Sequence, residues 1–251
     1  MKHIIIAAVV AIFATFAQAQ DTPKKLCKKK QHEPENIVLN SQGAGNNFIF
    51  TFTPGKYHNY PTLAIWIEDT EGNYIQDLFV TQSFAKGIFR YGAQQNGKWT
   101  EGPRRYQATL PYYLHKRATA LHLTDIVPDS KQPVPDAYTG ATPGADFSLK
   151  VNSNEIMKEK YRILIEINQA WDVNEYWYNN RFENDNDYKA SCQPSLVYAV
   201  TIDPSDLMDE YVFNPIGHGH YSGKDGRLYT DLSTLTTALK IFTKISVVVA
   251  P

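Results

Sequence analysis

Apolar residues alternate with polar ones along much of the chain, with the period of two that is typical of half-buried β-strands. The pattern is clearest at 47–53, where Phe48, Phe50 and Phe52 fall on one face. It recurs at 161–168, where every second residue is again apolar. Further strands are predicted at 63–67, 74–81, 147–151, 196–202 and 241–249.

Two local patterns refine this picture. The polar stretch 69–73 separates two predicted strands and favours a hairpin, and Trp66 is predicted to lie on the face opposite Ile65. At 231–240 the period changes, because three leucines follow a helical spacing behind Asp231, a residue type that often caps helices. We therefore expect one helix at 231–240.

Several strands with hairpin turns and few helices predict an all-β fold. We expect an antiparallel immunoglobulin-like β-sandwich with long loop insertions and at most one or two short helices. The sandwich is expected as a single domain at 47–251, after an N-terminal tail at 20–46. Four prolines at 127–144 disfavour a helix or a central strand there, so this segment is predicted to be an exposed loop between strands.

The N-terminus has the features of a secretory signal peptide at 1–19. Lys2 supplies the positive charge, 4–16 is apolar, and Ala17-Gln18-Ala19 fits a cleavage site before Gln20. The apolar run is shorter than the roughly 20 residues that a spanning helix needs, so no membrane span is expected in the mature form. The sequence thus predicts an exported protein, periplasmic or otherwise extracytoplasmic.

Charge and cysteine content add two expectations. The formal net charge of −1 gives no basic excess, so nucleic acid is not expected as a partner. In an oxidising compartment the two cysteines, Cys27 and Cys192, are candidates for a disulfide, and idle thiols are the alternative.

The segment 136–144, Asp-Ala-Tyr-Thr-Gly-Ala-Thr-Pro-Gly, carries the candidate chemistry. An ordinary polar turn is the alternative interpretation. The segment resembles the flavinylation motif, in which an Asp precedes a Ser/Thr-Gly-Ala-Ser/Thr tetrad and ApbE-type flavin transferases attach FMN through its phosphate. The resemblance implies covalent FMN on Thr142, with Asp136, Thr139, Gly140 and Ala141 completing the motif. Pro143 departs from the motif by stiffening the chain directly after the acceptor.

A second resemblance covers most of the mature chain. The stretch 57–69, which ends in Trp-Ile-Glu-Asp, together with Gly72, Asn73, Leu78 and the tetrad, is similar to the periplasmic family called domain of unknown function 2271. Genes of that family occur beside flavin transferases and membrane redox proteins. The resemblance implies a flavin carrier whose partners are a flavin transferase and a membrane or periplasmic redox protein.

Two other groups of residues are candidate sites. His218 and His220 lie two apart, and on a strand both would point to one face and could bind a metal; hydrogen bonding within a glycine-rich loop, or contact with the flavin phosphate, are the alternatives. The segment 168–188 is rich in aromatic residues that either stack on a flavin or a sugar or cover the end of the sandwich: Trp171, Tyr176, Trp177 and Tyr178.

Three functions from different classes follow from these patterns. The first is electron transfer by covalent FMN outside the cytoplasm. The second is a secreted ligand- or partner-binding β-sandwich module without redox activity, and the third is a metal-binding protein that uses His218 and His220. No nucleophilic triad or paired catalytic carboxylates stand out, so an electron-transfer carrier is favoured over an enzyme with its own substrate.

Overall fold

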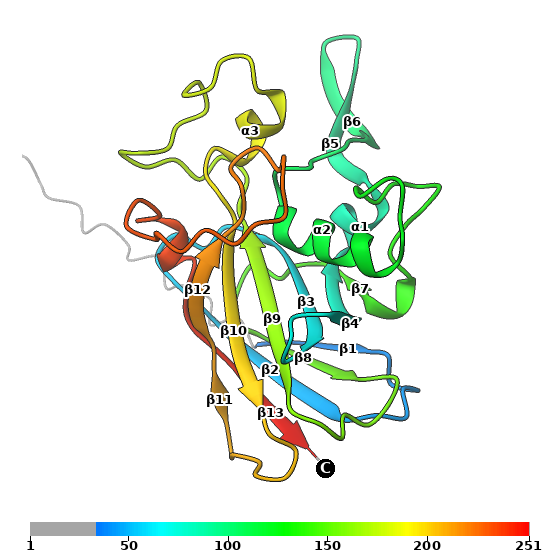
Figure 1. The fold of residues 1–251 in the computed structure, drawn as a ribbon. Coiled ribbons are helices and arrows are strands. Elements are labelled where there is room, and N and C mark those ends of the chain that lie inside the picture. Colours follow the sequence, from blue (N-terminus) through cyan, green and yellow to red (C-terminus); the bar gives the residue numbers. More distant parts are fainter. Residues whose placement is uncertain (1–33, 251) are drawn as a thin grey trace, which may run out of the picture. The chain divides into compact units, whose positions relative to one another are not determined.

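The structure is a computed structural model that describes residues 34–250, and its core is a pair of sheets packed face to face (Figure 1). The first sheet has five strands in the order β1 (Glu35–Leu39), β8 (Phe147–Asn152), β2 (Asn47–Pro54), β13 (Phe242–Ala250) and β11 (Tyr211–Val212). The second has six in the order β12 (Asn214–His218), β10 (Leu196–Ile202), β9 (Tyr161–Asn168), β3 (Thr62–Asp69), β4 (Tyr74–Thr81) and β7 (Thr139–Gly140).

The remaining elements are short. A separate hairpin joins β5 (Ile88–Gln95) to β6 (Lys98–Pro103). The helices within 34–250 are α1 (Gln82–Lys86), α2 (Pro111–Ala120) and α3 (Asn186–Ser191), with 3-10 turns η1 (Asp136–Tyr138) and η2 (Ala238–Lys240). None of these helices is long and apolar enough to cross a membrane. The predicted all-β sandwich is confirmed, with three short helices within 34–250 where at most one or two were expected. Its strand pairs are antiparallel apart from β1–β8 and β4–β7.

The core between the sheets follows from the alternation seen in the sequence. Phe48, Phe50 and Phe52 of β2 are all fully buried and face the six-stranded sheet. On the neighbouring strand, Phe147 stacks on Phe52 with ring centroids 4.4 Å apart and planes 6° apart. The aromatic side chains therefore fill the space between the layers.

The six-stranded sheet is also covered on its outer face. Trp66 is fully buried there, opposite the Ile65 face as predicted, and contacts Tyr113 of α2 at a ring distance of 5.5 Å. Val134, in the loop that follows α2, belongs to the same cluster. Burial on both faces explains why β3 is buried nearly throughout, without a solvent-facing row.

Three sequence-based boundaries differ from the structure. The helix expected at 231–240 is absent: only η2 forms at its end, because Leu235 alone among the three leucines is fully buried while Leu239 is exposed. The expected tail at 20–46 contains β1, which pairs with β8 and so belongs to the sandwich. The loop 127–144 joins α2 to β8, rather than two strands, and contains η1 and β7.

Other expectations concern residues outside the described range. The signal peptide at 1–19 and Cys27 both lie in that part of the chain. Cys192 is buried, and its thiol donates to the carbonyl of Lys189 at 3.1 Å. The disulfide between Cys27 and Cys192 therefore stays a prediction.

Candidate functional site

The Thr-Gly-Ala-Thr tetrad lies at one end of the six-stranded sheet, which we call the loop end. At this end β3 begins, and β4, β7 and β9 finish (Figure 1). Thr139 and Gly140 form β7, paired in parallel with Val80 and Thr81 of β4. A Cβ on Gly140 would lie 3.1 Å from the ring of Phe79, so glycine lets the tetrad pack closely on the sheet.

The two threonines of the tetrad have different surroundings. Thr139 is only 6% exposed, and its hydroxyl donates to the carbonyl of Asp136 at 3.5 Å. Thr142 is half-buried, beside an exposed Ala141. Its Oγ1 lies 2.8 Å from Oγ1 of Thr81. Of the two threonines, Thr142 is therefore the more exposed residue.

Asp136 precedes the tetrad in the sequence and has an exposed carboxylate. Its side chain is 80% exposed and pairs with Lys86 of α1 at 3.0 Å. Beside the pair is a shallow pocket of about 400 Å³ lined by Lys86, Ile88, Ser130, Pro133, Val134, Pro135 and Asp136. The 3-10 turn η1 begins at Asp136, directly after Pro135, so the proline helps to set where the carboxylate projects.

The surroundings of Thr142 suit an attached FMN. A phosphodiester on Thr142 Oγ1 needs a donor nearby, and the hydroxyl of Thr81 is within hydrogen-bond distance of that atom. A flavin ring needs an open flat surface, and Tyr60, which lies against Gly144 of the same loop, is exposed. FMN would be held at its phosphate end by Thr142 and Thr81.

Three residues of this site were missed by the sequence analysis. The sequence predicts Thr81 only as the end of a strand, gives Lys86 no role, and includes Tyr60 only within the stretch 57–69 that carries a family resemblance. None carries a local signal, because each becomes relevant through contacts with a loop about 50 to 80 positions away in the chain. Pairing of β4 with β7 brings Thr81 beside the tetrad.

The candidate metal residues are held by other interactions. His218 ends β12, stacks on Tyr229 with centroids 5.3 Å apart, and has Nδ1 2.7 Å from the Gly219 carbonyl. His220 stacks on Tyr221, and its Nδ1 accepts from the Ser222 amide at 3.1 Å. Within residues 34–250 no group of three or more His, Cys, Asp or Glu side chains could hold a metal ion.

The aromatic segment at 168–188 is divided between packing and exposure. Trp177 packs near Tyr188 and donates its indole N–H to Thr234 at 3.0 Å, so it covers the loop end. Trp171, Tyr176 and Tyr178 are exposed. These three remain available for contact with a ligand or a partner.

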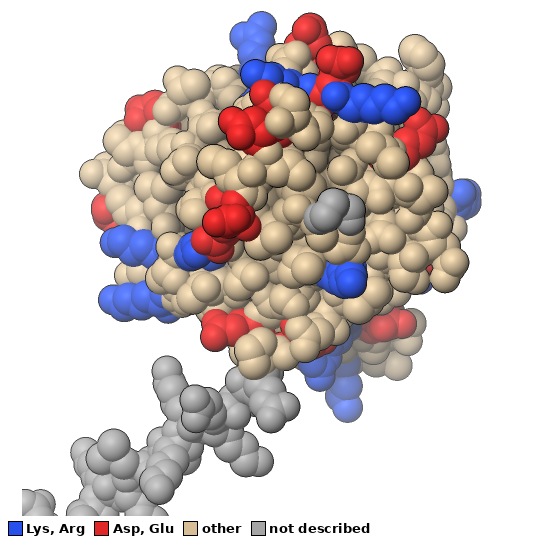
Figure 2. Space-filling model, turned by 90° about the horizontal axis from the view of Figure 1, so that it is seen from below, with Lys and Arg blue, Asp and Glu red and all other residues tan. Residues whose placement is uncertain are grey.

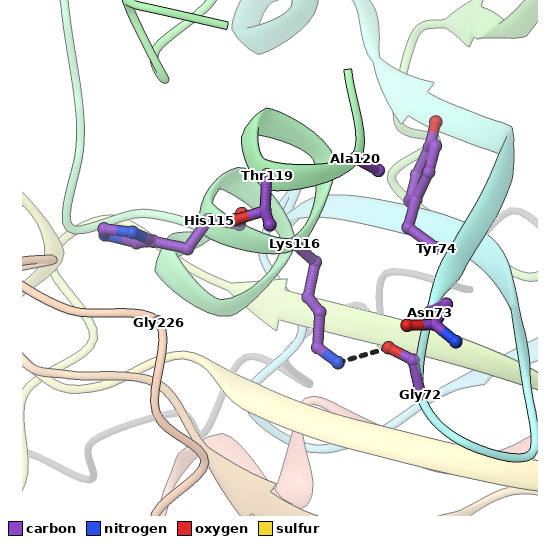
Figure 3. Close-up of a pocket in the computed structure, with 8 residues that line it drawn as sticks. All are labelled: Gly72, Asn73, Tyr74, His115, Lys116, Thr119, Ala120 and Gly226. Atoms are coloured by element: carbon purple, nitrogen blue, oxygen red, sulfur yellow. Dashed lines mark hydrogen bonds between the residues drawn. The ribbon is translucent and has the colours of Figure 1, made fainter. Parts of the chain in front are cut away.

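A second hollow, of about 510 Å³, lies at the other end of β4 between the β3–β4 turn and α2 (Figure 3). Lys116 points into it, but its ammonium donates to the carbonyl of Gly72 at 2.5 Å and lies 3.6 Å from the buried carboxylate of Glu68. The lysine thus ties α2 to the hairpin turn.

On the face seen in Figure 2, basic and acidic side chains are interspersed, and neither sign of charge forms a separate patch.

A buried carboxylate, Glu166 of β9, organises the start of α2. Its oxygens accept hydrogen bonds from the amides of Tyr112 and Tyr113 and from the hydroxyl of Ser195, at 3.2, 2.7 and 2.5 Å. Burial raises the pKa of Glu166 to about 7, although these three hydrogen bonds act to lower it. Because Leu110 provides no side-chain cap, Glu166 caps the helix from the sheet.

The chain has no match among protein-family models, curated proteins or solved structures.

Proposed function

We propose that this protein is an exported flavoprotein that carries FMN on Thr142 through a phosphoester and acts in extracytoplasmic electron transfer. The observation that carries the proposal is the position of the motif: residue Thr142 is half-buried at the loop end, whereas residue Thr139 is buried. The resemblance to the flavinylation motif identifies the same threonine.

Attachment requires a flavin transferase with FAD as the donor. The hydroxyl oxygen of Thr142 attacks the phosphorus on the FMN side of the diphosphate, a P–O bond breaks, and AMP leaves. The hydroxyl proton passes to a base. A threonine hydroxyl is a weak nucleophile, so the base and the metal ion come from the transferase.

The chain's own residues then position the modified loop. Pairing of β7 with β4 fixes the tetrad, and the hydroxyl of Thr81 donates to oxygen at the new ester. The bound FMN supplies the redox chemistry, while the fold supplies orientation and polarity. A covalent link also prevents loss of the cofactor outside the cytoplasm.

The test is to coexpress the full chain with an ApbE-type flavin transferase and to measure its mass and in-gel flavin fluorescence. We expect a mass increase of one FMN less water. Thr142→Ala abolishes it, whereas Thr142→Ser and Thr139→Ser retain it, since each leaves a hydroxyl at position 142. Retained fluorescence in Thr142→Ala would overturn the proposal and favour a binding module that uses the exposed aromatic residues.

A further inference from the structure

Tyr60 is an exposed tyrosine on a loop next to the tetrad. The residue is 68% exposed, whereas Tyr113, Tyr161 and Tyr188 are buried. The residue precedes β3 by two positions, at the loop end, and its backbone has a φ of 48°, in the left-handed region that side chains other than glycine rarely adopt. The fold thus maintains an exposed aromatic ring in an unfavourable backbone conformation.

The loop that carries Tyr60 is tied to the sheet on both sides. The side-chain oxygen of Gln169 accepts from the amide of Asn59 at 2.7 Å, and its Nε2 donates to the carbonyl of Tyr57 at 2.9 Å. Gln169 follows β9 directly and is buried, as is Pro61 on the other side of Tyr60. The ring is therefore exposed on an anchored loop.

The ring of Tyr60 lies against Gly144, at the end of the segment 136–144 that contains the tetrad. A Cβ placed on Gly144 would be 2.5 Å from Cζ and Oη of Tyr60 and 2.7 Å from Cε1, so glycine is needed for this approach. Gly144 comes two residues after Thr142, with the buried Pro143 between them. Tyr60 and the modified oxygen accordingly belong to one small region of the loop end.

We propose that the isoalloxazine ring of the FMN on Thr142 stacks on the exposed part of Tyr60. The inference rests on the proposed function and assigns the residue that holds the ring end of the cofactor. Offset stacking of two aromatic systems suits a flat, rigidly held phenol. A flavin ring on Tyr60 has one face shielded from water, and the phenol quenches flavin fluorescence by donating an electron to the excited ring.

The test compares four proteins made with the transferase: wild type, Tyr60→Ala, Gly144→Ala and Tyr91→Ala. Tyr91, on the β5–β6 hairpin, is 59% exposed and serves as the matched control. Mass spectrometry first gives the FMN content of each protein. Fluorescence yield is then measured per bound FMN, together with the visible absorption spectrum.

We expect the fluorescence yield per bound FMN to be several-fold higher in Tyr60→Ala than in wild type. The visible absorption spectrum of this variant should also be closer to that of free FMN. Gly144→Ala changes in the same direction, because the added methyl group displaces the ring of Tyr60, while Tyr91→Ala matches wild type. Equal yields in wild type and Tyr60→Ala, with FMN present in both, would overturn the stacking and leave the proposed function intact. A wild-type protein that carries no FMN after coexpression with the transferase would overturn both the stacking and the proposed function.

Discussion

The hydroxyl of Thr81 lies 2.8 Å from the hydroxyl of Thr142 and links the end of β4 to the last residue of the tetrad. The same Thr81 oxygen accepts a hydrogen bond from the amide of Leu63 at 3.0 Å. Thr81 is buried, so its hydroxyl serves the sheet and the loop at once. If Thr142 carries FMN as proposed, its Oγ1 becomes an ester oxygen without a proton, and the hydroxyl of Thr81 would be the donor between these two atoms.

Substitution of Thr81 separates these two roles. Thr81→Val keeps the side-chain shape but leaves the buried amide of Leu63 without an acceptor, so we expect a loss of about 1 to 3 kcal/mol in the free energy of unfolding. Thr81→Ser retains the acceptor and is expected to lose less. Urea unfolding measures both, and equal stabilities of the two variants would contradict this account. FMN content should persist in both, because Thr142 is unchanged.

Glu166 makes the stability of the protein depend on pH. Its pKa in the folded protein is about 7, against 4.5 for an ordinary glutamate, so between these values the folded state holds a proton that the unfolded state has lost. The stabilising contribution is complete below pH 4.5 and disappears as pH rises through 7. A shift of this size corresponds to about 3 kcal/mol.

Glu166→Gln mimics the neutral carboxyl: its oxygen accepts from the amide of Tyr113 and its NH₂ donates to Ser195, while the amide of Tyr112 loses its acceptor at every pH. We expect the stability of the variant relative to wild type to increase by up to about 3 kcal/mol between pH 4.5 and pH 8. Urea unfolding at both pH values gives this difference. Asp172, whose pKa burial raises to about 6, is present in both proteins and cancels. A constant difference between the two pH values would argue against the assignment.

The stacked pair of Phe52 and Phe147 tests the packing of the sandwich. Both rings are buried, so Phe147→Ala should lower the free energy of unfolding by about 3 to 5 kcal/mol, and Phe147→Leu by clearly less. Val38→Ala, at an exposed position of β1, is the control and should stay within about 0.5 kcal/mol of wild type. A Phe147→Ala protein as stable as the control would mean that the two sheets do not pack as described.

The long strands of the sandwich could be predicted from sequence because each buries at least one face. The phenylalanines of β2 give period two directly, and 69–73 marks the hairpin between β3 and β4. Helix α2 was missed, although Pro111 at its first position is a start signal, because it lacks a side-chain N-cap and depends on Glu166 from a distant strand. The sequence around α2 gives no indication that Glu166 caps this helix.

The candidate site could be predicted only in part. The motif residues are recognisable in the sequence, and the structure places Asp136 in η1, Thr139 in the edge strand β7, and Thr142 two residues after that strand. Which of the threonines is buried, and which residues outside the motif face them, depends on the pairing of β7 with β4. The same limit explains why the helix predicted at 231–240 is wrong. The leucines there have helical spacing, but only Leu235 is fully buried.

Asp136 and Lys86 allow recognition by the transferase to be separated from stability. The two side chains form an ion pair at 3.0 Å but are 80% and 39% exposed, so breaking it should change the free energy of unfolding by less than about 1 kcal/mol. Under the proposed function, Asp136→Asn is nevertheless expected to lose most of its FMN on coexpression, because the transferase would read the carboxylate as part of the motif. Mass spectrometry and urea unfolding of the same preparation measure the two effects.

Lys86→Gln is the matched control for Asp136→Asn. It breaks the same ion pair and leaves every motif residue in place. If the transferase reads the carboxylate itself, Lys86→Gln keeps its FMN while Asp136→Asn does not. Equal loss of FMN in both variants would show instead that the ion pair matters by holding η1 in position against α1, and full FMN content in both would remove Asp136 from the recognised motif.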